Sequence, residues 1–135
     1  MTLPPTLPLL RDIMVRDVVT LDPDLEILTA MDILVTRRLS GAPVLGPGGA
    51  LLGILTKKDC FRAALNASYY QQWGGAVRDY MTSPVKTLPP DMDVVEAAEA
   101  FLDSSFRRFP IVEDGALVGQ ISRADLLAAM TRLWR

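Results

Sequence analysis

Two segments of the chain carry apolar residues at positions i, i+1, i+4, i+7 and i+8, the spacing that gathers them on one face of a helix. In the first segment these residues are Ile27, Leu28, Met31, Leu34 and Val35. In the second they are Val94, Val95, Ala98, Phe101 and Leu102. Asp24 and Asp91 precede the segments at positions suited to a helix N-cap. The pattern predicts two amphipathic helices.

Short apolar runs separated by turn residues predict strands near these helices. Residues 43–45 and 51–55 enclose a Gly-Pro-Gly-Gly turn, and residues 110–112 and 117–121 enclose Glu-Asp-Gly. Each pair predicts a β-hairpin. An extended segment, residues 18–21 or 85–88, precedes each helix, and a last helix begins near Lys57 or Arg123. The predicted order of elements is therefore β-α-β-β-α, twice.

The chain is a tandem duplication. Residues 10–14 align with residues 77–81 at an offset of 67, which holds through the extended segments and the first helices. One extra residue in the first copy then changes the offset to 66, at which Asp59 aligns with Asp125. A register kept over this length indicates one structural unit written twice.

The composition excludes several kinds of site. The chain has 135 residues, a net charge of -2, no histidine and one cysteine, Cys60. Cys60 forms no internal disulfide and is expected to pack as a small apolar residue. Without histidine, the commonest zinc ligand and the commonest general base are missing, so we predict no metal site, no catalytic residues and no required cofactor. Nucleic acid is disfavoured as the main partner, because no basic excess exists to neutralise its phosphates.

The amino-terminal residues 1–10 are apolar and contain prolines, but they lack the positive n-region and the cleavage site of a secretory signal. The longest apolar runs of the sequence are shorter than a bilayer span. We therefore expect a cytoplasmic protein without a membrane partner.

Both copies carry the motif Gly-x-φ-[Ser/Thr]-x-x-Asp, in which φ is apolar, at the junction of a predicted strand and the last helix. The motif spans residues 53–59 and 119–125. A hydroxyl residue followed three positions later by an acid is typical of a capping box, which needs no ligand. The same geometry suits a nucleotide, because a helix N-terminus attracts phosphate and a carboxylate can accept both hydroxyls of a ribose. The residues alone leave both interpretations open.

In their order and repetition, these features resemble the CBS domain. The resemblance rests on the duplication, the Thr-x-x-Pro turn after each extended segment, the φ-Pro-φ strand and the motif at the strand-to-helix junction. It implies an α/β (α+β) fold, with two β-α-β-β-α repeats packed sheet to sheet in pseudo-two-fold symmetry. We predict repeats at residues 10–66 and 77–133, joined by a connector at residues 67–76 whose aromatic side chains pack against the protein.

The resemblance also implies two nucleotide-binding clefts, each combining residues of both copies. In each cleft the aspartate would hold the ribose, and backbone and apolar groups of the strands would enclose the adenine. One cleft would use Thr87, Arg107, Arg108, Phe109 and Ile111 with Thr56 and Asp59. The other would use Thr20, Ser40, Gly41, Ala42 and Val44 with Ser122 and Asp125.

Two arginines distinguish the clefts. Arg107 and Arg108 stand where nucleotide-sensing relatives place phosphate contacts, whereas the first copy has Ser40 and Gly41 there. We therefore expect a phosphorylated ligand to prefer the cleft of Arg107 and Arg108. In the alternative interpretation the arginines are the solvated end of a helix, where positive charge is favourable.

The resemblance implies a regulatory module rather than an enzyme. Its expected ligand is AMP, ADP or ATP, and S-adenosylmethionine is a further candidate. Binding would signal to a partner protein or through the interface of a homodimer, since CBS pairs usually associate through their helices. The alternative function is a protein–protein interaction or assembly module that kept the fold without sensing a ligand.

Overall fold

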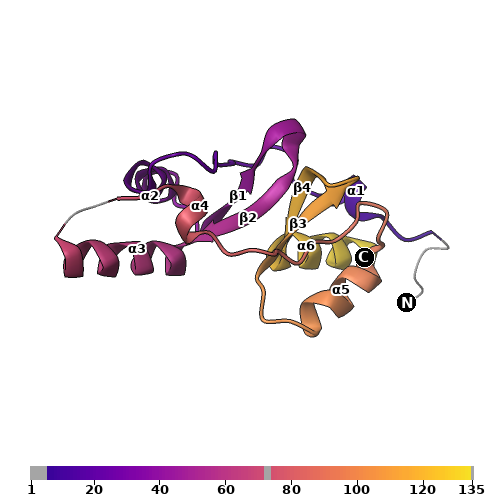
Figure 1. Cartoon of the computed structure of the whole chain (residues 1–135). Helices are drawn as coiled ribbons and strands as arrows, with labels where there is room; N and C mark the ends of the chain where they lie inside the picture. The colour runs from indigo at the N-terminus through magenta and orange to yellow at the C-terminus, as the bar shows by residue number, and fades with distance from the viewer. Residues whose placement is uncertain (1–5, 72–73, 135) are drawn as a thin grey trace. The chain divides into compact units, whose positions relative to one another are not determined.

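The first repeat contains a two-stranded antiparallel sheet (Figure 1). In the computed structural model, which describes residues 6–71 and 74–134, β1 (Gly41–Leu45) pairs with β2 (Leu51–Thr56). The short 3-10 helix η1 (Pro47–Gly49) forms the connection between the two strands. The predicted hairpin of the first repeat is therefore confirmed.

The second repeat contains the equivalent sheet. Here β3 (Arg108–Glu113) pairs with β4 (Ala116–Ser122) in antiparallel orientation. The pairing shifts register between Ile111 and Val112, and β1 and β2 shift register at the equivalent place, between Val44 and Leu45. Both the predicted hairpins and their duplication are present in the structure.

The predicted first strand of each repeat is reduced to a single bridge residue. Leu21 bridges Val44, and Leu88 bridges Ile111, both in parallel orientation. The backbone hydrogen bonds on either side of Leu21 are 2.9 and 3.0 Å long, so the contact is regular although it is short. The extended segments thus join each sheet at one position rather than along a full strand.

The first long helix of each repeat begins later than predicted. α2 (Ile27–Thr36) and α5 (Val94–Leu102) each begin three residues after the aspartate expected to cap them. Because an N-cap lies directly before the first helical residue, the prediction that Asp24 and Asp91 are N-caps is wrong. Asp24 instead forms an exposed ion pair with Arg78.

A different aspartate caps α5. The Asp93 carboxylate accepts hydrogen bonds from the N–H groups of Val95 and Glu96, both at 2.9 Å. The Glu96 side chain in turn accepts a hydrogen bond from the Asp93 N–H at 3.3 Å. These reciprocal bonds form a capping box, which explains why α5 begins at Val94.

The last helix of each repeat begins where the sequence predicts. α3 (Lys57–Tyr70) follows β2 directly, and α6 (Arg123–Leu133) follows β4. α3 continues past the predicted repeat boundary, so the first residues of the predicted connector are helical. Tyr69 and Tyr70 are 79% and 72% exposed, so the expectation that these connector aromatics pack against the protein is wrong. The rest of that expectation, on Trp73, lies outside the described residues.

The compact units of the structure do not coincide with the sequence repeats. One unit comprises the described residues of Val19–Val85, and the other those of Met1–Val18 and Lys86–Arg135. We call them the β1–β2 unit and the β3–β4 unit. Consequently α1 (Leu10–Ile13) belongs to the unit built by the second repeat, and α4 (Val77–Tyr80) to the unit built by the first.

Each unit has its own hydrophobic core, and the crossing helix contributes to it. Val77 of α4 is fully buried in the core of the β1–β2 unit, which also contains Leu34 and Leu55. Leu10 of α1 is fully buried in the core of the β3–β4 unit, which includes Phe109. Neither core is complete without a residue from the other repeat.

The glycine that opens each motif allows the crossing segment to approach the sheet. A Cβ atom on Gly53 would lie 2.7 Å from the Thr82 carbonyl oxygen, and one on Gly119 would lie 2.9 Å from the Val15 carbonyl oxygen. Thr82 and Val15 each form an antiparallel bridge with the residue that follows the glycine. The glycine of the motif therefore has a packing role that is independent of any ligand.

Candidate functional site

The first motif forms the N-terminus of α3. The Thr56 hydroxyl accepts a hydrogen bond from the Asp59 N–H at 3.3 Å. The Asp59 carboxylate accepts hydrogen bonds from the N–H and the hydroxyl of Thr56, both at 2.9 Å. The capping box that the sequence left as one of two interpretations is therefore formed here.

Two further side chains bind the same carboxylate. Arg62, one turn along α3, forms an ion pair with Asp59. The Thr82 hydroxyl, from the segment after α4, lies 3.1 and 3.3 Å from the two Asp59 carboxylate oxygens and donates to them. The Asp59 side chain is only 1% exposed. Its carboxylate is thus surrounded by donors that all belong to the β1–β2 unit.

The second motif leaves its aspartate in a different state. Ser122 caps α6, and its hydroxyl accepts a hydrogen bond from the Asp125 N–H at 3.1 Å. Among the described residues of the β3–β4 unit, none donates a hydrogen bond or an ion pair to the Asp125 carboxylate. Asp125 is only partly buried, so within its unit this carboxylate keeps its acceptor capacity.

The sequence explains the difference between the two motifs. The offset of 67 aligns Thr82 with Val15, and the offset of 66 aligns Arg62 with Ala128. Valine and alanine have no polar hydrogen to donate. The β3–β4 unit therefore has the aspartate but lacks the two side chains that bind it in the β1–β2 unit.

The strand register brings two predicted arginines to the second motif. Arg108 is the direct partner of Ser122 in the β3–β4 ladder. The Arg107 carbonyl accepts a hydrogen bond of 3.0 Å from the N–H of Arg123, the first residue of α6. Arg107 is exposed and Arg108 is partly buried. We call Arg107, Arg108, Ser122 and Asp125 the β3–β4 edge.

The sequence predicted the four residues of this edge in two different clefts, with the arginines in one and Ser122 and Asp125 in the other. A two-residue turn alone would pair Arg108 with Ile121, because Glu113 pairs with Ala116. The register shift after Ile111 moves the pairing by one residue and sets Arg108 opposite Ser122. No turn residue in the sequence marks this bulge. The proximity of Arg108 to Ser122 could therefore not be predicted from the sequence.

The apolar residues predicted to enclose the adenine are core residues. Ala42, Val44 and Ile111 are 1% exposed or less, as is Phe109. The Phe109 ring lies 4.8 Å, centroid to centroid, from the Phe101 ring. These side chains hold the sheets to the helices, so a ligand would meet the backbone of these residues.

The remaining predicted contacts lie where the extended segments meet the sheets. Thr20 is exposed and Thr87 is partly buried, and each directly precedes a bridge residue. Ser40 is exposed, and its carbonyl accepts a hydrogen bond of 3.0 Å from the Lys57 N–H at the start of α3. Gly41 is the ladder partner of Thr56. Each predicted cleft draws on both units, and that combination stays a prediction.

The thiol beside the first motif is not activated. Burial raises the pKa of Cys60 above its ordinary value, and the neighbouring Asp59 carboxylate raises this pKa further. Both causes keep the thiol protonated near neutral pH. Cys60 belongs to the core of the β1–β2 unit, as expected for a small apolar residue.

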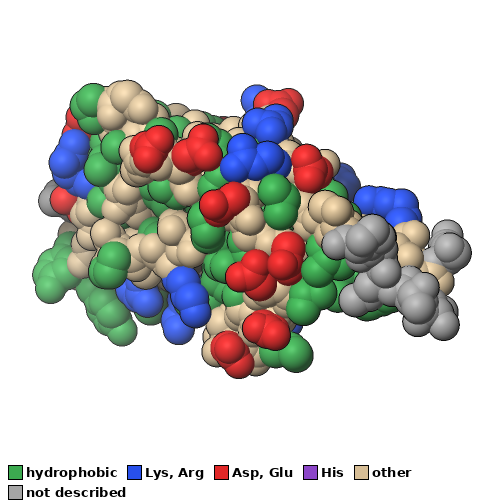
Figure 2. All heavy atoms as spheres, turned by 90° about the vertical axis from the view of Figure 1, so that its right-hand side faces the viewer, with side chains coloured by type: hydrophobic (Ala, Val, Ile, Leu, Met, Phe, Trp, Pro, Cys, Tyr) green, Lys and Arg blue, Asp and Glu red, His purple; other side chains and the backbone are tan. Residues whose placement is uncertain are grey.

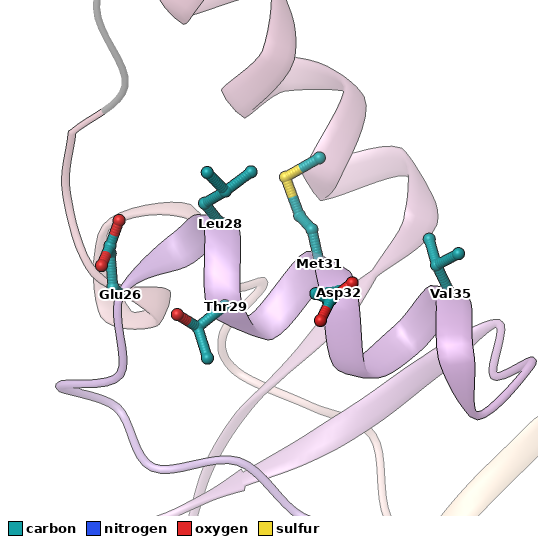
Figure 3. Close-up of a pocket in the computed structure, with 6 residues that line it drawn as sticks. All are labelled: Glu26, Leu28, Thr29, Met31, Asp32 and Val35. Carbon is teal, nitrogen blue, oxygen red and sulfur yellow. The ribbon is translucent and has the colours of Figure 1, made fainter.

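Three described grooves lie on helix faces. The first, of about 660 Å³, follows α2, and Figure 3 shows Leu28, Met31 and Val35 on the same side of this helix. Grooves of about 230 and 510 Å³ lie on the α2–α3 and α5–α6 faces. Val35 and Leu102, which occupy equivalent positions in the two repeats, are 74% and 85% exposed. Each unit thus presents exposed apolar side chains on a face of its helices.

Charge is mixed on the face of the molecule drawn in Figure 2. Acidic and basic side chains are both spread over this face. Among the residues described there, the basic side chains form no continuous surface of the kind that a phosphate backbone requires.

Two structural features are absent from the part of the chain that the structure describes, residues 6–71 and 74–134. No helix there combines the length and the apolar character needed to cross a membrane. No group of three or more Cys, Asp or Glu side chains there is arranged to hold a metal ion.

Comparison with known proteins identifies the repeats. The sequence profile of the CBS domain matches residues 10–66 and 77–132. An uncharacterized protein of Methanocaldococcus jannaschii is 29% identical over 124 residues, covering 92% of this chain and 43% of the relative. Inosine-5'-monophosphate dehydrogenase of Thermoplasma acidophilum is 33% identical over 116 residues, covering 85% of this chain and 22% of the enzyme. The chain therefore spans less than half the length of either relative.

A solved structure shares the fold. CBSX2 of Arabidopsis thaliana, crystallised in complex with AMP, matches with a TM-score of 0.81 and 25% sequence identity. The match covers 94% of this chain and 98% of CBSX2. It confirms the predicted α+β fold of tandem repeats.

Proposed function

The chain belongs to the CBS domain family, and we propose that it is a regulatory module that binds an adenosine-type ligand. AMP is the first candidate, because the related pair CBSX2 was crystallised with AMP. ADP, ATP and S-adenosylmethionine, expected from the sequence resemblance, are the further candidates. The module contributes regulation rather than catalysis, and it acts on a partner protein or through a dimer interface.

The composition of the β3–β4 edge is the observation that carries this proposal. Arg107 and Arg108 supply positive charge next to the first turn of α6, and Ser122 supplies a hydroxyl at its N-cap. The Asp125 carboxylate accepts no hydrogen bond from the described residues of its unit. A nucleotide presents the complementary groups, namely a phosphate and a pair of ribose hydroxyls.

The chemistry of recognition follows from these groups. A helix N-terminus has free N–H groups and the positive end of a dipole, so it favours a phosphate, and arginine binds phosphate oxygens with two parallel hydrogen bonds. A carboxylate accepts a ribose hydroxyl in a charge-assisted bond worth about 1.5–3 kcal/mol. The adenine would contact the backbone of the φ-Pro-φ strands, since their side chains are buried in the cores.

The sequence predicts two clefts, one with Thr87, Arg107, Arg108, Phe109 and Ile111 joined by Thr56 and Asp59, and one with Thr20, Ala42 and Val44 joined by Ser122 and Asp125. The proposal keeps these contacts but groups the arginines with Ser122 and Asp125, because the four residues share the β3–β4 edge. The role of Asp59 is a separate inference. Regulation then requires that the ligand bind one conformation or assembly more tightly than another, because only a difference in affinity shifts such an equilibrium.

We further propose that the chain forms a homodimer through its helices. Val35 and Phe61 are exposed on the α2–α3 face, and Leu102 and Leu127 are exposed on the α5–α6 face. A two-fold interface needs the same surface on both partners, and the duplication supplies two equivalent apolar faces for it. Exposed apolar surface of this kind commonly marks a protein interface.

The alternative function is an interaction or assembly module without a ligand. The exposed helix faces support it as well, because they serve association in either case. Retention of Asp125 with free acceptor capacity favours the ligand-binding function, since a pure assembly module has no use for that carboxylate.

A thermal unfolding panel tests the proposed function. The full chain is heated with AMP, ADP, ATP, adenosine or S-adenosylmethionine, with GMP as the control for the base. A ligand present at 100 times its Kd adds about 2.7 kcal/mol to the free energy of unfolding, which raises the midpoint by several degrees. If none of the adenosine compounds moves the midpoint, the sensing function is wrong and the assembly function stands.

A variant in the arginine pair tests the phosphate contact. The double variant Arg107→Ala with Arg108→Ala should lower the affinity for AMP by about tenfold or more. Its affinity for adenosine, which has no phosphate, should be almost unchanged. Equal losses for AMP and adenosine would show that the arginines do not contact the phosphate.

A further inference from the structure

We infer that the two motif aspartates have different roles: Asp125 accepts the ribose hydroxyls, whereas Asp59 is a structural anchor that Thr82 and Arg62 close to ligand. The role of Asp125 rests on the proposed function. The role of Asp59 goes beyond it and departs from the sequence expectation, which preferred the cleft of Asp59 for a phosphorylated ligand.

The hydrogen bonds of Asp59 carry the first half of the inference. Its carboxylate accepts the N–H and hydroxyl of Thr56 at 2.9 Å, the Thr82 hydroxyl at 3.1 and 3.3 Å, and the Arg62 guanidinium. A carboxylate has about four acceptor positions, and these donors occupy them. A ribose would have to displace an ion pair and a hydroxyl before it could bind.

The position of Thr82 explains what the anchor does. Thr82 lies on the segment that follows α4, and this segment bridges β2 through Ile54, with backbone hydrogen bonds of 2.9 and 3.0 Å. Asp59, at the N-terminus of α3, therefore ties the crossing segment of the second repeat to the β1–β2 unit. Replacing this carboxylate should reduce stability whether or not a ligand exists.

The second half of the inference rests on Asp125, which occupies the position equivalent to Asp59. Asp125 belongs to the same motif, but in the β3–β4 unit Val15 and Ala128 stand where Thr82 and Arg62 stand in the β1–β2 unit. The backbone cap of α6 uses the Ser122 hydroxyl and the Asp125 N–H, neither of which involves the Asp125 carboxylate. The carboxylate can therefore bind a ligand without any loss to the helix cap.

Thr82 and Arg62 are accordingly the residues that decide which aspartate is available. Both belong to the β1–β2 unit and have no polar counterpart in the β3–β4 unit, so together they make the two units of a duplicated protein unequal. The expected result is one tight binding event for AMP per chain, dependent on Asp125.

A matched pair of variants tests these roles on the full chain, with AMP binding measured by isothermal titration calorimetry and stability by thermal unfolding. Asp125→Asn should lower AMP affinity by about tenfold or more and leave the midpoint of the ligand-free protein within about one degree. Asp59→Asn should lower that midpoint by several degrees and leave AMP affinity within about twofold. A loss of affinity in Asp59→Asn equal to or larger than that in Asp125→Asn overturns the inference.

A second variant covers the case in which Asp59→Asn does not fold. Thr82→Val combined with Arg62→Ala copies Val15 and Ala128 of the β3–β4 unit and leaves Asp59 in place. The Asp125-dependent binding event should keep its affinity within about twofold, and a tenfold change in it overturns the inference.

The same experiment separates this inference from the proposed function. If the wild-type chain binds no adenosine compound, the proposed function fails together with the role of Asp125. The anchor role of Asp59 is then decided by the midpoints alone. If the wild type binds AMP and binding depends on Asp59, the proposed function stands and only the inference fails.

Discussion

The side chains of Cys60 and Asp59 are neighbours in the sequence and are both buried in the β1–β2 unit. Asp59 is satisfied by charged and polar donors, whereas Cys60 packs among apolar residues of the core. The two residues show opposite ways of burying a titratable group: one carboxylate has partners for its charge, and one thiol stays neutral.

The neutral thiol leads to a prediction about how the free energy of unfolding changes at alkaline pH. The pKa of Cys60 is raised in the folded chain, first by burial and then by Asp59, so above about pH 8.5 the unfolded chain loses the thiol proton before the folded chain does. The folded state then binds more protons than the unfolded state, and the free energy of unfolding falls as pH rises. Urea unfolding between pH 7 and 10 should show a steeper alkaline decline for the wild type than for Cys60→Ala. Parallel declines in the two proteins would contradict this role of the thiol.

At the residue scale, the sequence predicted the motif but not its partners. The spacing of Thr56 and Asp59 predicted both a capping box and a ligand site, and the cap is what the structure forms. Thr82 lies 23 positions from Asp59, so the contact depends on the path of the chain between them. No local pattern reports such a path, and this explains why the inequality of the two aspartates was not predicted.

The strands and helices show the same limit at the element scale. The starts of α3 and α6 were predicted because a hydroxyl residue at the N-cap acts locally. The start of α5 was misplaced because two aspartates follow Pro90, and the partner Glu96 favours Asp93 over Asp91. The start of α2 was misplaced because α2 begins after Glu26 without a side-chain cap. Local chemistry therefore predicts the start of a helix where the expected cap is the residue directly before it.

The close approach of the segment after α4 to β2 leads to a second prediction. Gly53→Ala should destabilise the fold by about 1–3 kcal/mol, because its Cβ would lie 2.7 Å from the Thr82 carbonyl oxygen and 2.9 Å from the Met81 sulfur. The backbone carbonyl cannot move without breaking its bridge to β2. Urea unfolding measures the loss.

Gly74→Ala is the matched control for this substitution. A Cβ atom on Gly74 would have no neighbour within 4 Å, so this variant should unfold near the wild-type urea midpoint. Equal midpoints for Gly53→Ala and the wild type would show that the crossing segment is not held against β2.

For the whole molecule, the sequence predicted the duplication and the family, and the fold agrees. It did not predict that α1 and α4 exchange between the units. Repeat boundaries follow from self-similarity along the chain, whereas compact units follow from which residues share a core. Leu10 and Val77 align with each other in the repeat, yet each is buried in the core built by the other copy.

The exposed helix faces make a prediction at this scale. Val35→Glu combined with Leu102→Glu places charge on both apolar faces, so it should convert the proposed dimer into monomers, which sedimentation velocity can measure. Lys86→Glu, at an exposed position outside both faces, changes the net charge by the same amount and should leave the dimer intact. A wild-type chain that sediments as a monomer would contradict the proposed homodimer.

The exchange of α1 and α4 has a consequence for how a single repeat could fold. A single repeat has a sheet and two long helices, but the segment it carries at its amino end completes a different copy. Two separate one-repeat chains could complete both cores only by exchanging these segments, as in a domain-swapped dimer. In this chain both segments belong to one polypeptide, so the effective concentration of the missing segment is set by the linker and not by the concentration of a second chain. Each copy can therefore complete the other without being identical to it, as the unequal surroundings of Asp59 and Asp125 show.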